Sequence, residues 1–272
     1  MSYPTQTAPK RDLRPAECHE GLKADEPLPL RELLVYPVVI SISNYVCLAF
    51  LNISLTALLP LFLAMPLEIG GLNLSPPIIG YIIGTFGIAS AIFHTFYSAS
   101  IIRRWGERRV FIAAMSTLIP VFLLLPLINF VARGWGRLSF GVCILVGILI
   151  ILMVLMDLAY GEWTCSSSQG LLVSFPFTDS GTIFMFITAS APNNSSLGAT
   201  NGLSQMTVSI ARAIGPAMST SLFSFSVENN IFGGFGVYII FATLSVLALR
   251  LATCLPSKVW EQHVPEHAAG WL

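Results

Sequence analysis

The sequence contains few charged residues. Of its 272 residues, 54% are hydrophobic and 10% are charged, and the mean hydropathy is +0.75. Soluble domains carry about 25% charged residues. A soluble globule of this composition would expose a nearly continuous apolar surface, which argues against a water-soluble enzyme. The 14 basic and 14 acidic side chains cancel, so the chain lacks the basic surface that a nucleic-acid partner would require.

Cysteine and histidine are also sparse, and their spacing indicates no metal centre. Five cysteines are scattered along the chain without the pairing that zinc or redox sites show. His263 and His267 are four residues apart, but Pro265 between them prevents a helical pair. No His, Asp and Ser constellation of a membrane-embedded enzyme is recognisable. We therefore expect no cofactor, no metal and no enzymatic activity.

Long apolar runs dominate the sequence. A bilayer core of about 30 Å needs roughly 20 apolar residues in a helix. These runs predict an all-α integral membrane domain over residues 33–256. We expect a disordered cytoplasmic tail at 1–32, which lacks the apolar core of a signal peptide, and a cytoplasmic tail at 257–272. The six expected helices are 33–65, 76–102, 110–131, 138–161 joined to 182–191, 198–225 and 231–255.

Basic residues are concentrated on one side of these spans. The tail before the first span contains Lys10, Arg11, Arg14, Lys23 and Arg31, and four arginines follow the second span. Only Arg133 and Arg137 fall on the opposite side. The positive-inside rule then places both termini in the cytoplasm if the number of spans is even, and six spans satisfy this condition. The plasma membrane and the vacuolar membrane fit this pattern equally well.

Residues 162–181 interrupt the fourth apolar run. They place Glu162, Asp179 and a serine cluster between two apolar stretches, and the stretch that follows is too short to span alone. A seventh helix over residues 170–191 would bury Asp179 and move the C-terminus outside. The first outcome is energetically costly, and the second disagrees with the charge pattern.

Joining Gly161 to Thr182 would instead produce one continuous apolar helix. The codons of residues 161–163 can contain GTGAGT, a eukaryotic intron start, and those of residues 180–181 can contain the CAG that ends introns. Our hypothesis is that residues 162–181 are a retained intron that would be removed in frame. The alternative is a lineage-specific extracellular or re-entrant loop.

Three motifs resemble the major facilitator superfamily. Residues 99–109, ASIIRRWGERR, resemble its signature loop, in the copy found in the second half, with Ala99 in place of a glycine and Arg103 in place of an aspartate. Residues 209–216, SIARAIGP, resemble the Gly-Pro motif of the fifth helix that is repeated in the eleventh. The strings FITASAP (186–192) and LGATNGL (197–203) are similar to fungal drug:proton antiporters, near the zinc-induced-facilitator-like group. The signature-loop residues are Arg103, Arg104, Gly106, Arg108 and Arg109.

This resemblance implies the C-terminal six-helix half of a major facilitator fold, helices seven to twelve of a twelve-helix transporter. The implied function is secondary-active, proton-coupled transport of a small solute across a lipid bilayer. Such carriers bind substrate between two halves, so we expect a fragment whose partner is the missing N-terminal half or a second copy. The alternatives are a non-transporting membrane protein, such as a sensor or regulatory half-subunit, and an inactive truncated product.

Asp157 is the first candidate for the proton pathway. An ionisable side chain within the membrane is costly and is therefore a functional candidate. If residues 162–181 are removed, Asp157 lies inside the joined helix, with Thr188 about three turns further along the same face. Asp157 is either a proton-coupling carboxylate or a carboxylate hydrogen-bonded to its neighbours near a helix end.

A polar stripe on the fifth span supplies further candidates. Asn201, Gln205 and Arg212 share one helical face with Pro216. Arg212 could pair with Asp157, attract an anionic substrate group, or bond backbone carbonyls as a structural residue. Gly215 and Pro216 form either a hinge or a packing kink.

A second polar stripe occupies the first span. Asn44 and Asn52 lie on one face together with Ser41, Tyr45 and Thr56. Their amides could line a cavity and bind a ligand, or they could form hydrogen bonds between helices. The arginine-rich signature loop is expected to contact cytoplasmic helix ends or anionic lipid headgroups.

Overall fold

The structure, a computed structural model, describes residues 34–136, 139–160, 182–190 and 196–255. Within these ranges the regular structure is helical, without strands. The expected tails at 1–32 and 257–272 and the interruption at 162–181 lie outside the described residues.

The helices follow the apolar runs closely. They are α2 (Tyr36–Ala64), α3 (Pro76–Phe93), α4 (Ala99–Trp105), α5 (Glu107–Ser116), α6 (Leu118–Trp135), α7 (Phe140–Tyr160), α8 (Thr182–Ser190), α9 (Leu197–Glu228) and α10 (Gly236–Thr253). Three short elements connect them: the 3₁₀ helices η1 (Leu67–Ile69) and η4 (Ile231–Gly234), and the π-helical turn η2 (His94–Ser98).

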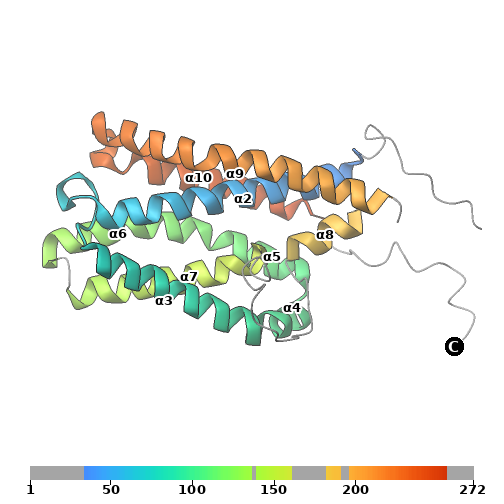
Figure 1. The fold of residues 1–272 in the computed structure, drawn as a ribbon, viewed down its shortest axis with the longest axis horizontal. Coiled ribbons are helices and arrows are strands. Elements are labelled where there is room, and N and C mark those ends of the chain that lie inside the picture. Colours follow the sequence, from blue (N-terminus) through green and yellow to red (C-terminus); the bar gives the residue numbers. More distant parts are fainter. Residues whose placement is uncertain (1–33, 137–138, 161–181, 191–195, 256–272) are drawn as a thin grey trace, which may run out of the picture.

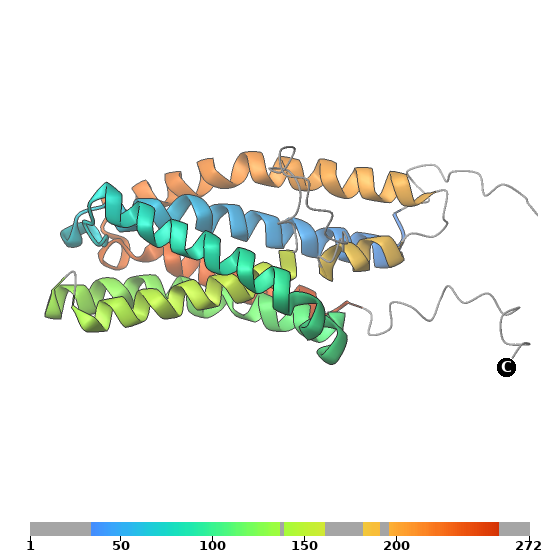
Figure 2. The same cartoon turned by 60° about the horizontal axis from the view of Figure 1, so that its bottom comes forward.

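Most of these helices pass lengthwise through one elongated bundle (Figures 1 and 2). Five helical stretches are long and apolar enough to cross a membrane: Tyr36–Ala64, Pro76–Trp105, Glu107–Trp135, Phe140–Ala159 and Gly236–Thr253. The sixth expected span, 198–225, forms α9, which has 32 residues but is less apolar because many serines, threonines and amides occupy it. The protein is thus an all-α membrane protein.

Two residues explain where the long spans break. Gly106 has φ +80° and separates α4 from α5, a backbone conformation that a side chain would disfavour. Pro120 lies in the first turn of α6, where its missing N–H costs no hydrogen bond within that helix. Helices α5 and α6 therefore meet at Thr117, and together they form one stretch of membrane-crossing length, Glu107–Trp135.

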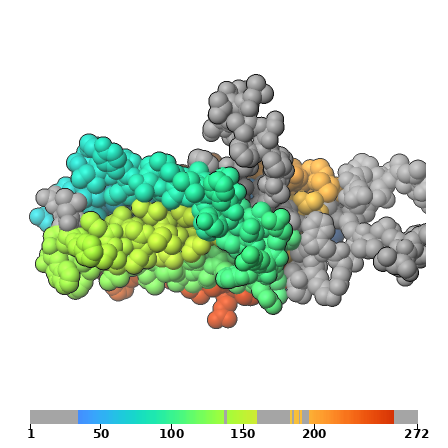
Figure 3. All heavy atoms as spheres, turned by 90° about the horizontal axis from the view of Figure 1, so that it is seen from below, coloured from blue at the N-terminus to red at the C-terminus, as the bar shows by residue number. Residues whose placement is uncertain are grey.

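Helix α2 lies at the centre of the packing. It contacts α9 most extensively and also packs on α8, α10 and α3. Behind it, α10 packs on α6, where Phe122 and Phe241 stack with ring centroids 5.3 Å apart. Helix α3 lies on the outside of the bundle beside α7 (Figure 3), and Ser90 is its single buried residue.

The two ends of the bundle are held by polar contacts. At one end, Arg108 donates a hydrogen bond of 2.8 Å to the carbonyl oxygen of Thr253, which brings the start of α5 to the end of α10. At the other end, Asn129 and Arg133 of α6 donate to carbonyl oxygens of the α2–α3 connection, including those of Leu67 and Glu68. The basic signature loop and the end of α10 therefore share one end of the bundle.

Candidate functional site

Asp157 lies at the contact between α7 and α3. Ser90 donates a hydrogen bond to Oδ2 of Asp157 with a distance of 2.8 Å, and the Ser90 side chain is 2% exposed. Four partly buried apolar residues of α3 pack against the core, and the bond from Ser90 to Asp157 adds a polar tie between α3 and α7. The structure thus places a carboxylate at an interhelical contact inside an apolar segment.

His94 lies one turn beyond Ser90 on the same face of the second span. It begins the π-helical turn η2, and its Nε2 atom is buried without a hydrogen-bond partner among the described residues. π-Helical turns inside longer helices are frequent at functional sites. The candidate polar site therefore consists of Ser90, His94 and Asp157.

The structure does not bring Arg212 to Asp157. Asp157 accepts its hydrogen bond from Ser90, whereas Arg212 lies half-buried on α9. Asn201 and Gln205 are also half-buried on α9, and the Oδ1 atom of Asn201 is buried without a partner in the described part of the chain. The expected stripe lies beside the face of α9 that packs on α2.

That packing face of α9 consists mainly of small residues. A Cβ atom on Gly215 would overlap the Cγ2 atom of Ile53, so the glycine permits a close approach of α9 to α2. The hydroxyls of Ser219 and Thr220 donate to the carbonyl oxygen of Pro216. This geometry favours the packing-kink interpretation of Gly215 and Pro216 over a hinge.

The two asparagines of the first span have different surroundings. Asn44 is fully buried, and its Nδ2 atom donates to the carbonyl oxygens of Ile40, at 2.9 Å, and of Leu251 on α10, at 3.4 Å. This geometry matches the interhelical alternative for Asn44, whose Oδ1 atom is buried without a hydrogen-bond partner among the described residues. Asn52 is half-buried, and its backbone carbonyl oxygen accepts a hydrogen bond from the hydroxyl of Thr56.

The remaining candidates lie near the end of the bundle that carries the signature loop. Thr188 is exposed on α8, and Arg103, Arg104 and Arg109 are exposed at the α4–α5 junction. Arg108 contacts the last turn of α10, as expected for a loop that binds helix ends. In the described part of the chain, His, Cys, Asp and Glu form no group of three or more that could hold a metal ion.

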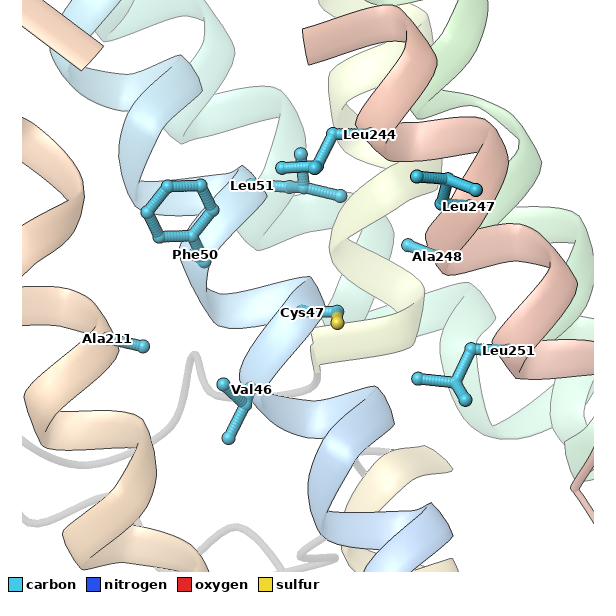
Figure 4. A pocket seen from close by; sticks show the side chains of 9 residues that line it. All are labelled: Val46, Cys47, Phe50, Leu51, Ala211, Leu244, Leu247, Ala248 and Leu251. Carbon is cyan, nitrogen blue, oxygen red and sulfur yellow. The ribbon is translucent and has the colours of Figure 1, made fainter. Parts of the chain in front are cut away.

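An apolar groove of about 390 Å³ lies between α2, α9 and α10 (Figure 4). It has almost no polar lining, so it cannot orient a polar solute by hydrogen bonds. Its chemistry suits an apolar chain. The lining residues are Val46, Cys47, Phe50, Leu51, Ala211, Leu244, Leu247, Ala248 and Leu251.

Two residues of structural consequence are not among the sequence-based candidates. Ser90 is an ordinary small polar residue in the sequence, and only the packing of α3 on α7 pairs it with Asp157. Asn129 is fully buried in α6 and donates to the carbonyl oxygens of Leu67 and Gly71. An amide inside an apolar span is a signal that could have identified Asn129.

The fold and these buried polar groups define an integral membrane protein with a polar contact inside its helices. The chain is 27% identical over 241 residues to the major facilitator-type transporter psiT2 of Psilocybe cyanescens, covering 86% of this chain and 42% of that protein. It is 24% identical over 246 residues to psiT2 of Psilocybe cubensis, covering 86% of the chain and 44% of the relative.

A third relative has a different name. The major facilitator superfamily multidrug transporter mfsB of Aspergillus fumigatus is 25% identical over 203 residues, which cover 71% of this chain and 29% of mfsB. No protein-family model and no solved structure matches the chain. The chain is therefore related to major facilitator-type transporters, in agreement with its signature loop, and it spans less than half the length of these relatives.

Proposed function

We propose that the chain forms one six-helix half of a secondary-active, proton-coupled carrier of a small solute. The observation that carries this proposal is the hydrogen bond between Ser90 and Asp157 at the contact of α3 and α7. The relatives' transporter names support the class. Both termini are proposed to face the cytoplasm, in the plasma membrane or the vacuolar membrane.

Protonation of Asp157 is the proposed coupling step. A hydroxyl donates a stronger hydrogen bond to a carboxylate than to a neutral carboxylic acid. A proton on Asp157 therefore weakens the tie to Ser90, the single fully buried residue of α3, and leaves α3 held by its partly buried apolar contacts. In this scheme proton binding favours movement of α3 relative to α7, while His94 supplies a second titratable group one turn away.

The exposed face of α3 supports a second half as partner. At Gly80, Gly84 and Gly87, a Cβ atom would meet nothing within 4 Å. Small residues at such spacing allow a neighbouring helix to approach closely in a membrane. We propose that a complementary N-terminal half, or a second copy of this chain, packs here and completes the substrate site.

The substrate is proposed to be a small organic molecule. The amides of Asn201 and Gln205 on α9, with Asn52 on α2, are suited to hydrogen-bond a polar solute. Arg212 would favour an anionic group on that solute. The name of the multidrug transporter mfsB is consistent with a small organic substrate.

Flux measurement tests this proposal. The chain is reconstituted into lipid vesicles, alone and with a complementary six-helix half, and uptake from a panel of small solutes is measured with and without a pH gradient. We expect pH-driven uptake in the paired sample. Asp157→Asn should abolish its pH-dependent part, because the side chain can no longer exchange a proton.

A matched control uses an asparagine at the opposite end of the bundle. Asn229→Ala changes an exposed side chain at the end of α9 and should leave uptake unchanged. If Asp157→Asn retains the full pH response while inserting normally, Asp157 is not the coupling residue. If the paired sample transports nothing while the chain binds its partner, the regulatory half-subunit alternative holds.

A further inference from the structure

We propose that α7 and α8 are two parts of one membrane crossing, and that the working form of the chain lacks residues 162–181. The two helices are separate elements, and the residues between them lie outside the described part of the chain. The inference rests on the length, position and buried face of α7 and α8. It does not depend on the proposed transport activity.

Helix lengths are the first observation. The second and third crossings, Pro76–Trp105 and Glu107–Trp135, contain 30 and 29 residues. Helix α7 contains 21 residues and α8 contains 9, so together they match a neighbouring crossing. By itself α7 is longer than the last crossing, Gly236–Thr253, which has 18 residues, so it can cross alone; α8 extends it to the length of the second and third crossings.

The position of α8 is the second observation. The rings of Phe186 on α8 and Phe111 on α5 have centroids 6.2 Å apart. Phe111 lies in the first half of α5, near the signature loop, so α8 reaches the level of that loop. Figures 1 and 2 both show α8 beyond the end of α7, and both helices pack on α5.

Helical register is the third observation. One buried stripe of α7 contains Val142, Leu149, Met153 and Met156, at steps of seven, four and three. Near its end α7 is also buried on other faces, at Val154, Leu158 and Ala159. If Thr182 followed Gly161 directly, Ile183 would come seven positions after Met156, and Ile187 four positions later. Ile183 and Ile187 are the buried aliphatic residues of α8. If twenty residues are removed, the buried face of α8 thus continues the buried stripe of α7. If nineteen or twenty-one residues were removed, the buried face of α8 would be turned by about 100° from that stripe.

The break also affects the polar site. Helix α7 ends three residues after Asp157, so the carboxylate that bonds Ser90 lies in its last turn. In the joined helix the same carboxylate lies in the interior of a continuous crossing.

Two experiments test the proposal. The first sequences full-length messages and asks whether the codons of residues 162–181 are present. The second purifies the whole chain and a variant that lacks residues 162–181 in lipid nanodiscs, and compares their helix content and thermal unfolding midpoints. We expect most messages to lack the segment and the shortened chain to unfold several degrees higher.

A matched variant separates register from mere shortening. The same deletion with two alanines inserted between Gly161 and Thr182 turns α8 by about 200°, which moves Ile183 and Ile187 to the opposite face. It should unfold below the simple deletion. The proposal is overturned if all messages retain the segment, if the whole chain is the most stable form, or if the two-alanine variant equals the deletion.

Discussion

Gly215 lies where α9 approaches α2 most closely. No side chain larger than hydrogen fits there, because the space is occupied by Ile53 and flanked by Phe50 and Ser54. Small residues drive helix association in membranes by allowing this type of contact. The sequence predicts a special role for the Gly215-Pro216 pair, and the structure assigns the glycine to packing.

Gly215→Ala should lower the stability of the protein by about 1–3 kcal/mol, since it overpacks the α2–α9 contact. Thermal unfolding in nanodiscs measures the effect. Gly202→Ala is the control, because Gly202 lies on the same helix with open space around it, and alanine favours a helix by about 0.5–1 kcal/mol over glycine. A Gly215→Ala protein as stable as the Gly202→Ala protein would remove Gly215 from the packing interface.

Asn129→Leu should destabilise the connection between α2 and α3. The substitution removes the hydrogen bonds to the carbonyl oxygens of Leu67 and Gly71, at a cost of about 1–3 kcal/mol. Faster proteolysis in residues 65–75 and a lower unfolding midpoint would show the effect. Asn229→Leu is the control, because that amide donates to Phe225 within its own helix; equal behaviour of the two variants would contradict the assignment.

At the scale of the elements, glycines, prolines and helix ends determine how the spans are divided. Gly106 ends α4 and begins α5, and Arg108 follows at once to bond the end of α10. A positive charge near the C-terminus of a helix interacts favourably with its dipole. The signature loop thus connects the second and third crossings to the last.

Arg108→Gln should loosen the last turn of α10, because it removes a charged donor from the carbonyl oxygen of Thr253. The expected loss is about 0.3–1 kcal/mol, confined to that turn. Amide hydrogen exchange in residues 249–254 measures it directly. Arg104→Gln, at an exposed position in the same loop, should leave this exchange unchanged. Equal exchange in both variants would show that Arg108 does not hold α10.

At the scale of the whole molecule, six helical passes bring the start of α2 and the end of α10 to the same end of the bundle. The bond from Asn44 on α2 to Leu251 on α10 shows this directly. In the proposed orientation, in which this end faces the cytoplasm, antibody should reach an epitope at Trp271 only after the plasma membrane, or a vacuole, is opened. An epitope inserted after Asn230, at the opposite end, should be reached from the other side. Detection of the Trp271 epitope on intact cells would refute the proposed orientation.

Much of the fold follows from the residue pattern. Apolar run lengths and the positions of Gly, Pro and charged residues predict most helix bounds to within a few residues, because a bilayer core demands a nearly constant helix length. The single helix expected over 138–161 joined to 182–191 is instead two separate helices in the structure, α7 and α8. Side-chain pairing does not follow in the same way. From the pattern of polar faces, Asp157 could equally well pair with Arg212. In the structure Asp157 accepts a hydrogen bond from Ser90.

The sequence by itself determined that this is an all-α membrane protein related to major facilitator-type transporters, since composition, run length and the signature loop are local properties of the chain. Only the tertiary structure decided which polar groups meet. It placed Asn44 against α10, Gly215 against Ile53 and Ser90 against Asp157. These contacts depend on how helices rotate and cross, and helix crossing is set by the packing of many side chains at once.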